Sequence, residues 1–169
     1  MNKPIADIEL QPRPPAYAAT GPAAERYDAR MGMVGMALGA KKLGYNITAV
    51  PPGKRAFPLH SHQVNEEMIF VLEGAGEVRI GEATWPIRQG DFVAMLAGGK
   101  ETAHVVTNTG NTELKYLSVS TRISPEICEY PTTGKFAIFA EQPAGADGKP
   151  GFFRYVGREG VAADYWEGE

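Results

Sequence analysis

The chain has 169 residues, of which 43% are hydrophobic and 22% charged, and its formal net charge is −3. This composition excludes a disordered chain, and the length suits one domain with a sizeable core. An acidic balance without a cluster of Lys and Arg argues against a nucleic acid or an anionic membrane as partner.

Targeting features are absent from the sequence pattern. No apolar run approaches the roughly 20 residues of a membrane helix, and the N-terminus lacks the basic-then-apolar layout of a signal peptide. The single cysteine, Cys128, permits no internal disulfide, which agrees with a reducing compartment. We therefore expect a cytoplasmic protein.

The N-terminal segment, residues 1–40, is predicted to be an extended arm and cover. Residues 1–26 are rich in proline, which fixes φ and lacks an amide hydrogen, so an arm lying on the body or on a partner subunit is expected. A loose tail is the alternative. Residues 27–39 are apolar but interrupted by glycines, which favours a short strand or irregular cover over a stable helix.

The middle of the chain, residues 41–123, is predicted to form a barrel core of short strands. Turn residues separate the strands, and Gly81-Glu82 is predicted to be a two-residue hairpin turn. No long amphipathic helix is evident, so the pattern indicates an antiparallel barrel or sandwich. The predicted strands are residues 43–50, 68–72, 76–80, 83–88, 92–96, 103–107 and 114–122.

Residues 124–169 are predicted to be a C-terminal extension that packs on the barrel. Residues 136–139 and 152–156 are candidate strands, separated by a loop over 142–151, and Tyr165 and Trp166 in the tail are expected to pack on an apolar surface. Residues 68–72 are apolar on both faces, so this strand needs cover from the interior on one side and from a second sheet or subunit on the other. We expect a homodimer.

The three histidines of the chain are the main functional signal. Strand side chains alternate, so His60 and His62 point the same way, and a short turn brings Glu67 beside them. If the strand of His104 is a neighbour, three nitrogens and one carboxylate oxygen surround a divalent metal. The donors suit Fe, Mn, Ni, Co, Cu or Zn, and the lack of a nearby thiolate disfavours a closed structural zinc site.

Several neighbouring side chains leave alternatives open. Either Glu66 or Glu67 could be the carboxylate ligand; the spacing to Gly74 favours Glu67, and alternation then turns Glu66 outward. Lys100 and Glu101, just before His104, are candidates for proton transfer or substrate anchoring, with simple solvation as the competing interpretation. Cys128 has no basic neighbour in sequence, which argues against a catalytic thiol.

Two motifs in this region resemble those of the cupins, small β-barrel proteins that usually hold a metal. The first is Gly53, six residues, His60-x-His62, four residues, Glu67, six residues, Gly74. The second runs from Gly90-Asp91-Phe92 through Leu96-Ala97-Gly98 to His104 and Asn108, the latter expected to close a turn with its side chain. One extra residue before His60, Leu96 where proline is usual, and a longer spacing before His104 depart from the pattern.

The resemblance implies an all-β fold, a single double-stranded β-helix (jelly-roll) barrel with N- and C-terminal extensions. Two later segments, Glu129-Tyr130-Pro131 and Asp164-Tyr165-Trp166-Glu167-Gly168-Glu169, resemble a subgroup of stand-alone cupins of mostly unassigned function that is sometimes labelled mannose-6-phosphate-isomerase-like. The resemblance to cupins also implies one divalent transition metal, such as Zn, Fe, Mn or Ni, held by His60, His62, Glu67 and His104. Catalytic residues are not identified.

Three functions are compatible with such a site. The first is a metal-dependent isomerase or epimerase acting as a Lewis acid on a sugar, sugar phosphate or oxo acid. The second is an Fe(II) dioxygenase, and the third is a non-catalytic module that senses a small ligand or metal. No general base stands out, and any partner is expected to be a small molecule.

Overall fold

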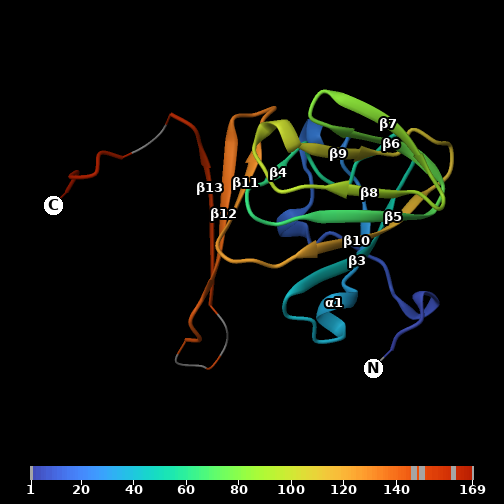
Figure 1. The fold of residues 1–169 in the computed structure, drawn as a ribbon, viewed down its shortest axis with the longest axis horizontal. Coiled ribbons are helices and arrows are strands. Elements are labelled where there is room, and N and C mark those ends of the chain that lie inside the picture. Colours follow the sequence, from blue (N-terminus) through green and yellow to red (C-terminus); the bar gives the residue numbers. More distant parts are fainter. Residues whose placement is uncertain (1, 146–147, 149–150, 161–162, 169) are drawn as a thin grey trace.

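The computed structural model describes residues 2–145, 148, 151–160 and 163–168, which form a nearly all-β structure as predicted (Figure 1). Three 3₁₀ turns and a one-turn helix precede the barrel, and one more 3₁₀ turn lies within it. Among the described residues, no helix is long and apolar enough to cross a membrane. The elements are η1 (Ile5–Asp7), β1 (Gln11–Pro12), η2 (Pro15–Tyr17), η3 (Gly21–Ala23), β2 (Arg30–Gly32), α1 (Val34–Ala37), β3 (Leu43–Val50), β4 (Ser61–His62), β5 (Glu67–Glu73), β6 (Ala75–Ile80), β7 (Ala83–Arg88), β8 (Phe92–Met95), η4 (Lys100–Thr102), β9 (His104–Thr107), β10 (Leu114–Thr121), β11 (Glu126–Tyr130), β12 (Lys135–Gln142) and β13 (Gly151–Arg158).

The strands form two layers. One layer is a six-stranded sheet in the order β1-β2-β3-β10-β5-β8. The other consists of β7-β6-β9 and β13-β12-β11-β4, which an isolated bridge between His60 and His104 joins. In that bridge the His60 amide donates to the His104 carbonyl at 3.1 Å, and the His104 amide donates back at 2.7 Å. The bridge therefore sets two candidate metal ligands side by side in the backbone.

The hydrophobic core lies between the layers. Val50, Val71 and Leu114 of the six-stranded sheet are fully buried, and Val78 and Ile87 approach them from β6 and β7. Alternation explains this, because every second residue of each strand faces inward. Burial of these side chains, each contributing about 1.5–3 kcal/mol, fixes the register and hence the position of every inward-facing polar residue.

The N-terminal segment lies on the body of its own chain. β1 pairs with β2, and β2 pairs with β3. Arg13 donates to the Ala56 carbonyl at 2.6 Å and its guanidinium lies 4.5 Å from the centre of the Phe57 ring. The expectation for residues 27–39 was wrong in part: β2 is a strand, but Val34–Ala37 form one helical turn. The glycine at position 35 allows this helical turn to pack closely on β3. A Cβ at Gly35 would lie only 3.1 Å from the Tyr45 amide nitrogen.

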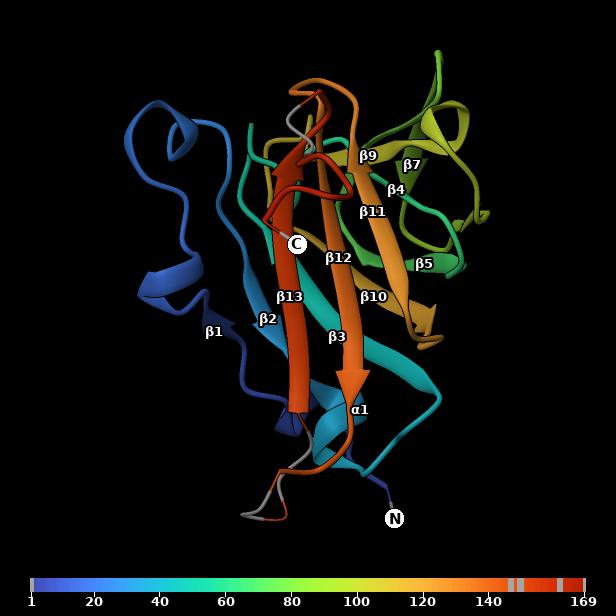
Figure 2. The ribbon, with the colours of Figure 1, turned by 90° about the vertical axis from the view of Figure 1, so that its left-hand side faces the viewer.

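The C-terminal extension forms a three-stranded hairpin sheet attached to β4 (Figure 2). The sequence predicted parts of β12 and β13 but not β11, which pairs directly with β4 so that Cys128 lies opposite His62. Part of the predicted loop at 142–151 lies outside the described residues. Tyr165 and Trp166 are 84% and 72% exposed, so the expectation that they pack on an apolar surface is wrong for the described part of the chain.

Candidate metal centre

Two short strands place the three imidazoles. β4 carries His62, and its partner β11 fixes the strand so that Ser61 is fully buried on one side while the histidines point to the other. His104 begins β9 and pairs with His60. The 3₁₀ turn η4 takes up the extra residues between Gly98 and His104, so the departure from the cupin spacing changes the loop and leaves His104 facing the other histidines.

The carboxylate comes from the opposite layer. Glu67 begins β5, and Glu66 beside it is exposed, as alternation predicts. The loop between β4 and β5 is held by Asn65, whose Oδ1 accepts from the Ile123 amide at 2.7 Å and from the Thr121 hydroxyl at 2.8 Å. The backbone amide of Asn65 also donates to Glu126 at 2.8 Å. These bonds aim Glu67 into the barrel.

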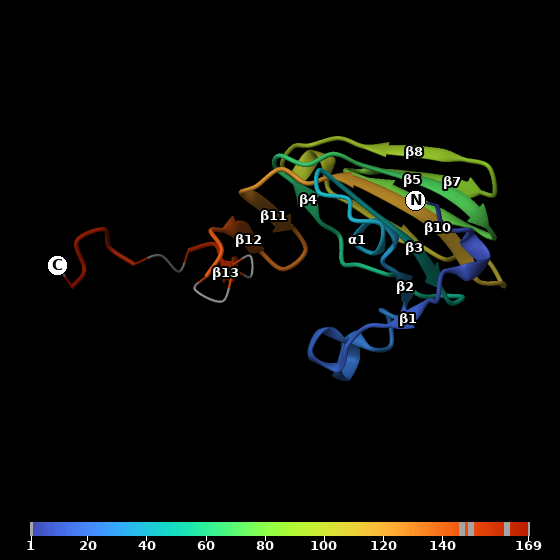
Figure 3. The same cartoon turned by 90° about the horizontal axis from the view of Figure 1, so that it is seen from below.

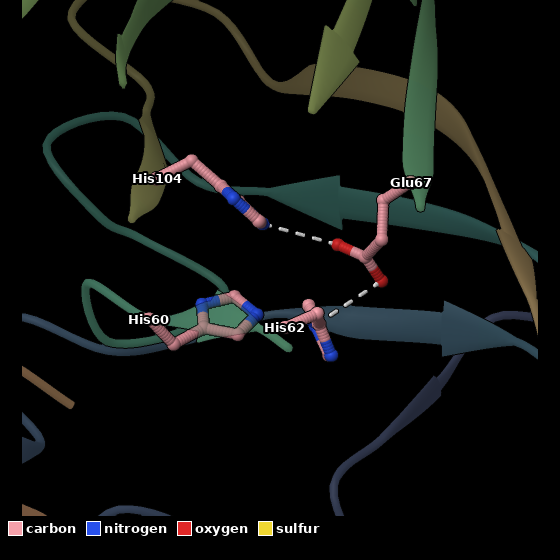
Figure 4. Close-up of side chains that lie close together, drawn as sticks. All are labelled: His60, His62, Glu67 and His104. Atoms are coloured by element: carbon pink, nitrogen blue, oxygen red, sulfur yellow. Dashed lines mark hydrogen bonds and ion pairs between the residues drawn. The ribbon is translucent and has the colours of Figure 1, made fainter. Parts of the chain in front are cut away.

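The four predicted side chains converge (Figure 4). One potential ligand atom from each of His60, His62, Glu67 and His104 lies within 4.8 Å of the others. The His104 Nε2 is 3.2 Å from one Glu67 oxygen, and the His62 Nε2 is 3.7 Å from the other. This spacing is small enough for a single ion to contact all four at ordinary bond lengths of about 2.0–2.2 Å.

Outer hydrogen bonds orient the rings. The His60 Nδ1 lies 2.9 Å from the Pro58 carbonyl, and the His104 Nδ1 lies 3.2 Å from the Thr102 carbonyl. A carbonyl only accepts, so each Nδ1 carries the proton and each Nε2 keeps its lone pair. The His62 Nε2 is buried without a hydrogen-bond partner among the described residues. An unpartnered buried nitrogen beside a carboxylate fits a metal ligand.

The charges of the site favour a cation. Burial, with a contribution from His104, lowers the pKa of His60 to about 4, so this imidazole is neutral at pH 7. Burial alone would raise the pKa of Glu67, but its contact with His104 and the nearby His62 and His60 lower it. Neutral imidazole and ionised carboxylate are the forms that bind divalent metals.

A cavity of about 240 Å³ opens over the four side chains. Its apolar walls include Phe57, Ile69, Met95 and Val106, and its other polar walls include Asn46, Tyr116 and Ser118 from β3 and β10. Neither Lys nor Arg is among the described residues that line it.

The C-terminal extension completes this cavity with Cys128, Tyr130 and Phe139, whose place at the site was not predicted from the sequence. The Tyr130 ring stacks on His60, with centroids 6.3 Å apart and planes 20° apart. The Cys128 Sγ lies 3.2 Å from the His62 Nδ1. Burial and the charge of Glu126 raise the pKa of Cys128 to about 12, so the thiol stays protonated, consistent with the prediction that it is no nucleophile.

The loop candidates Lys100 and Glu101 do not line the cavity. Lys100 forms an ion pair with Glu159 at 3.2 Å, and Glu101 is exposed and accepts from the Gly99 amide at 3.0 Å. Their contacts favour the solvation alternative. Asn108 closes its turn as predicted, because its Nδ2 donates to the Val50 and Thr112 carbonyls at 2.7 and 2.8 Å.

Comparison with known proteins finds relatives that are similar to this chain in sequence and in fold. An oxalate-binding protein of Thermotoga maritima is 36% identical over 70 residues, which are 41% of this chain and 54% of that protein. The chain spans about half the length of the curated relatives it matches. A candidate sugar phosphate isomerase from Acidithiobacillus ferrooxidans has a TM-score of 0.61 and 25% identity, covering 75% of this chain and 76% of the other.

A sugar phosphate isomerase of the cupin superfamily from Silicibacter pomeroyi has a TM-score of 0.69 over 91% of this chain and 92% of its own. At 23% identity this likeness establishes the fold alone. The family model of the cupin domain matches residues 46–120, which hold all four converging side chains and both motifs' histidines. Residues 46–120 are therefore a cupin domain.

Proposed function

We propose that His60, His62, Glu67 and His104 hold one divalent transition metal and that the protein acts on a small oxygen-bearing metabolite bound there. The observation that carries the proposal is the convergence of four potential ligand atoms within 4.8 Å beneath a cavity. When bound, such a metal supplies Lewis-acid polarisation of a carbonyl oxygen. The reaction class that we favour is isomerisation or epimerisation of a sugar or an oxo acid.

The residues of the chain have separate tasks in this proposal. The histidines and Glu67 bind the ion, with the backbone carbonyls of Pro58 and Thr102 fixing two of the rings. The apolar walls exclude water from the bound ligand, which strengthens electrostatic contacts inside the cavity. Tyr116 and Tyr130 line the cavity and both have raised pKa values, chiefly through burial, so each keeps its proton. They are hydrogen-bond donors toward a developing negative charge.

A second function is a non-catalytic module that binds a small oxo anion. The observation in its favour is that the described cavity residues include no carboxylate or imidazole besides the four proposed ligands. An isomerase needs a base to remove a proton from carbon, whereas a binding module does not. The relative named as an oxalate-binding protein points the same way. The Fe(II) dioxygenase alternative depends on the identity of the metal.

Deuterium exchange separates catalysis from binding. In D₂O, an isomerase is expected to exchange the hydrogen on the carbon beside a substrate carbonyl, which proton NMR follows over a panel of aldoses, ketoses and oxo acids. Metal-loaded protein should exchange at least one panel member faster than the metal-free protein does. Stoichiometric binding of a panel member with no exchange or turnover would contradict the isomerase and support the binding module.

We also propose that the protein is a homodimer that pairs through the C-terminal sheet. β13 is an edge strand of the C-terminal sheet, which lies beside the barrel (Figure 3). Its Phe153 and Tyr155 are 46% and 50% exposed. A long apolar edge strand is a ready site for pairing with another chain. A second copy would cover it by adding its own β13.

Light scattering tests this interface. The wild-type protein should have twice the chain mass of 18.2 kDa, and Phe153→Lys should have the mass of one chain because the new charge would be buried between copies. Phe92→Lys is the matched control, since Phe92 lies on β8, an edge strand of the six-stranded sheet, and is 72% exposed. A monomeric wild type, or dissociation by Phe92→Lys alone, would refute pairing through β13.

A further inference from the structure

A short polar strip crosses the otherwise apolar wall of the six-stranded sheet. Asn46 and Thr48 of β3 lie directly opposite Ser118 and Tyr116 of β10 in the strand register. Residues two apart in a strand share a face, so these four side chains point to the same side. Thr48 is fully buried and Tyr116 is 2% exposed. Asn46, Ser118 and Tyr116 line the cavity.

A hydrogen bond within the strip orients the Asn46 amide. The Thr48 hydroxyl donates to the Asn46 Oδ1 at 2.7 Å. An amide oxygen only accepts, so the proton of Thr48 is directed at Asn46. The Nδ2 of Asn46, which only donates, is thereby turned away from Thr48. A ligand at Asn46 meets a donor in a fixed direction.

The strip lies within reach of the proposed metal site. Asn46 is two strands from β5, the strand that carries Glu67, which is about 10 Å across the sheet. Side chains reaching inward from both strands shorten that gap to the span of a small molecule. The cavity volume of about 240 Å³ lies below the usual range for drug-sized ligands, about 300–1,000 Å³, and so also favours a small one.

The charge of the wall limits the ligand further. Among the described residues, no Lys or Arg lines the cavity. Arg13 and Lys135 are instead placed over the rings of Phe57 and Tyr130, at 4.5 and 5.9 Å. A phosphate or second carboxylate buried in the cavity would have no cation to pair with, and an unpaired buried charge is costly.

We propose that Asn46 is a second recognition point of this cavity, and that its ligand is a small 2-oxo or 2-hydroxy acid whose remaining part is uncharged. The acid's adjacent oxygens face the metal ligands, and Asn46 donates to an oxygen of the same group. Thr48 is a positioning residue that acts through Asn46. This inference rests on the proposed metal site and narrows its substrate class, because it excludes phosphorylated sugars.

Two probes with the same chelating end and different remainders test the charge argument. Protein loaded with Co(II) is titrated with 2-oxobutanoate, whose remainder is apolar, and with 2-oxoglutarate, whose remainder carries a carboxylate. Calorimetry gives the affinity, and the visible Co(II) absorption reports a ligand entering the metal's surroundings. We expect 2-oxobutanoate to bind at least about 10-fold more tightly, as a difference of about 1.4 kcal/mol would give. Equal affinities would overturn the restriction on charge.

Variants test the role of Asn46. Asn46→Leu should weaken 2-oxobutanoate by about 10-fold or more, the loss expected for one hydrogen bond to a charged group, while the Co(II) content stays at the wild-type value. Thr48→Val should weaken it less, because the amide remains but loses its fixed direction. Asn111→Leu, in an exposed turn, is the matched control. Asn46→Ser replaces Asn46→Leu if the latter does not fold.

The outcomes separate the two proposals. Unchanged 2-oxobutanoate affinity in a folded, Co(II)-loaded Asn46 variant would overturn the recognition role of Asn46 and leave the metal site standing. If the wild-type protein binds Co(II) but gives no heat and no spectral change with either acid, the bound metal is not open to an acid ligand, and the inference is contradicted. Failure of the wild type to bind Co(II) at all would count against the proposed function itself.

Discussion

The His62→Ala variant is expected to lose stoichiometric metal. Among the four converging residues His62 offers a free ligand atom, because its Nε2 is buried, lies 3.7 Å from Glu67 and has no hydrogen-bond partner among the described residues. Removal of a group that merely orients a ligand typically costs 10–100-fold in metal affinity, so removal of a ligand should cost more than about 100-fold. Calorimetric titration of the metal-free protein with Zn(II) measures the loss.

Gln63→Ala supplies the matched control for this variant. Gln63 is the exposed neighbour of His62 in the same loop, so its substitution tests the loop without touching the site. Both variants should give the far-ultraviolet circular dichroism of the wild type, since His62 contributes little to the core. Full metal retention by folded His62→Ala would remove His62 from the site and with it the four-ligand assignment.

A loss of about 3–5 kcal/mol in the free energy of unfolding is expected for Asn65→Ala. Asn65 is 7% exposed, and its side chain serves two segments at once, the loop that precedes Glu67 and the start of the C-terminal extension. It accepts from Ile123 and Thr121 and donates to the Ile123 carbonyl and to Glu126. The substitution leaves the buried partners of Asn65 without a hydrogen bond, including the Glu126 carboxylate, which is 6% exposed. Each buried polar group left without a partner costs about 1–3 kcal/mol.

Urea denaturation of the metal-free protein measures this loss without the contribution of metal binding. Asn111→Ala, an exposed asparagine in a turn, should change the free energy by less than about 0.5 kcal/mol. If Asn65→Ala unfolds at the same urea concentration as Asn111→Ala, the loop is not held by this network, and the account of how Glu67 is aimed into the barrel is wrong.

Much of the barrel and the candidate ligands could be predicted from the sequence because local patterns decide them. β3 and β7 have the predicted bounds, 43–50 and 83–88, since turn residues and alternation mark both ends. His60 and His62 are brought together with Glu67 and His104 as the motif spacing indicated. The choice of Glu67 over Glu66 followed from the spacing to Gly74, and Glu66 is exposed in the structure.

Contacts between distant segments explain the elements that were missed. β11 was not predicted because Glu126 occupies a buried position in it. The hydrogen bonds that Glu126 accepts, including those from the backbone amides of Val64 and Asn65, make that burial acceptable. The helical turn α1 forms despite its glycine because Gly35 packs closely against Tyr45. Neither the amides that bind Glu126 nor the contact of Gly35 with Tyr45 can be recognised from the neighbouring residues in the sequence.

The residues of the cavity wall could not be predicted from the sequence for a related reason. β3 is buried on both faces over residues 47–50, so periodicity alone does not say whether Thr48 or Ile47 faces the interior. Cys128 and Tyr130 belong to the strand that was missed, so their place beside His62 and His60 followed only from pairing of β11 with β4. A regular alternation of inward residues in 126–130 would have been the signal, and Glu126 obscures it.

Elemental analysis of the purified, untagged protein at known concentration tests the central claim most directly. The account predicts about one divalent transition metal per chain, either as purified or after reconstitution of the metal-free protein. Iron would direct the search to oxygen-dependent chemistry, and zinc, manganese or nickel to the Lewis-acid reaction. A protein that holds no metal after reconstitution would contradict the claim that His60, His62, Glu67 and His104 form a metal centre.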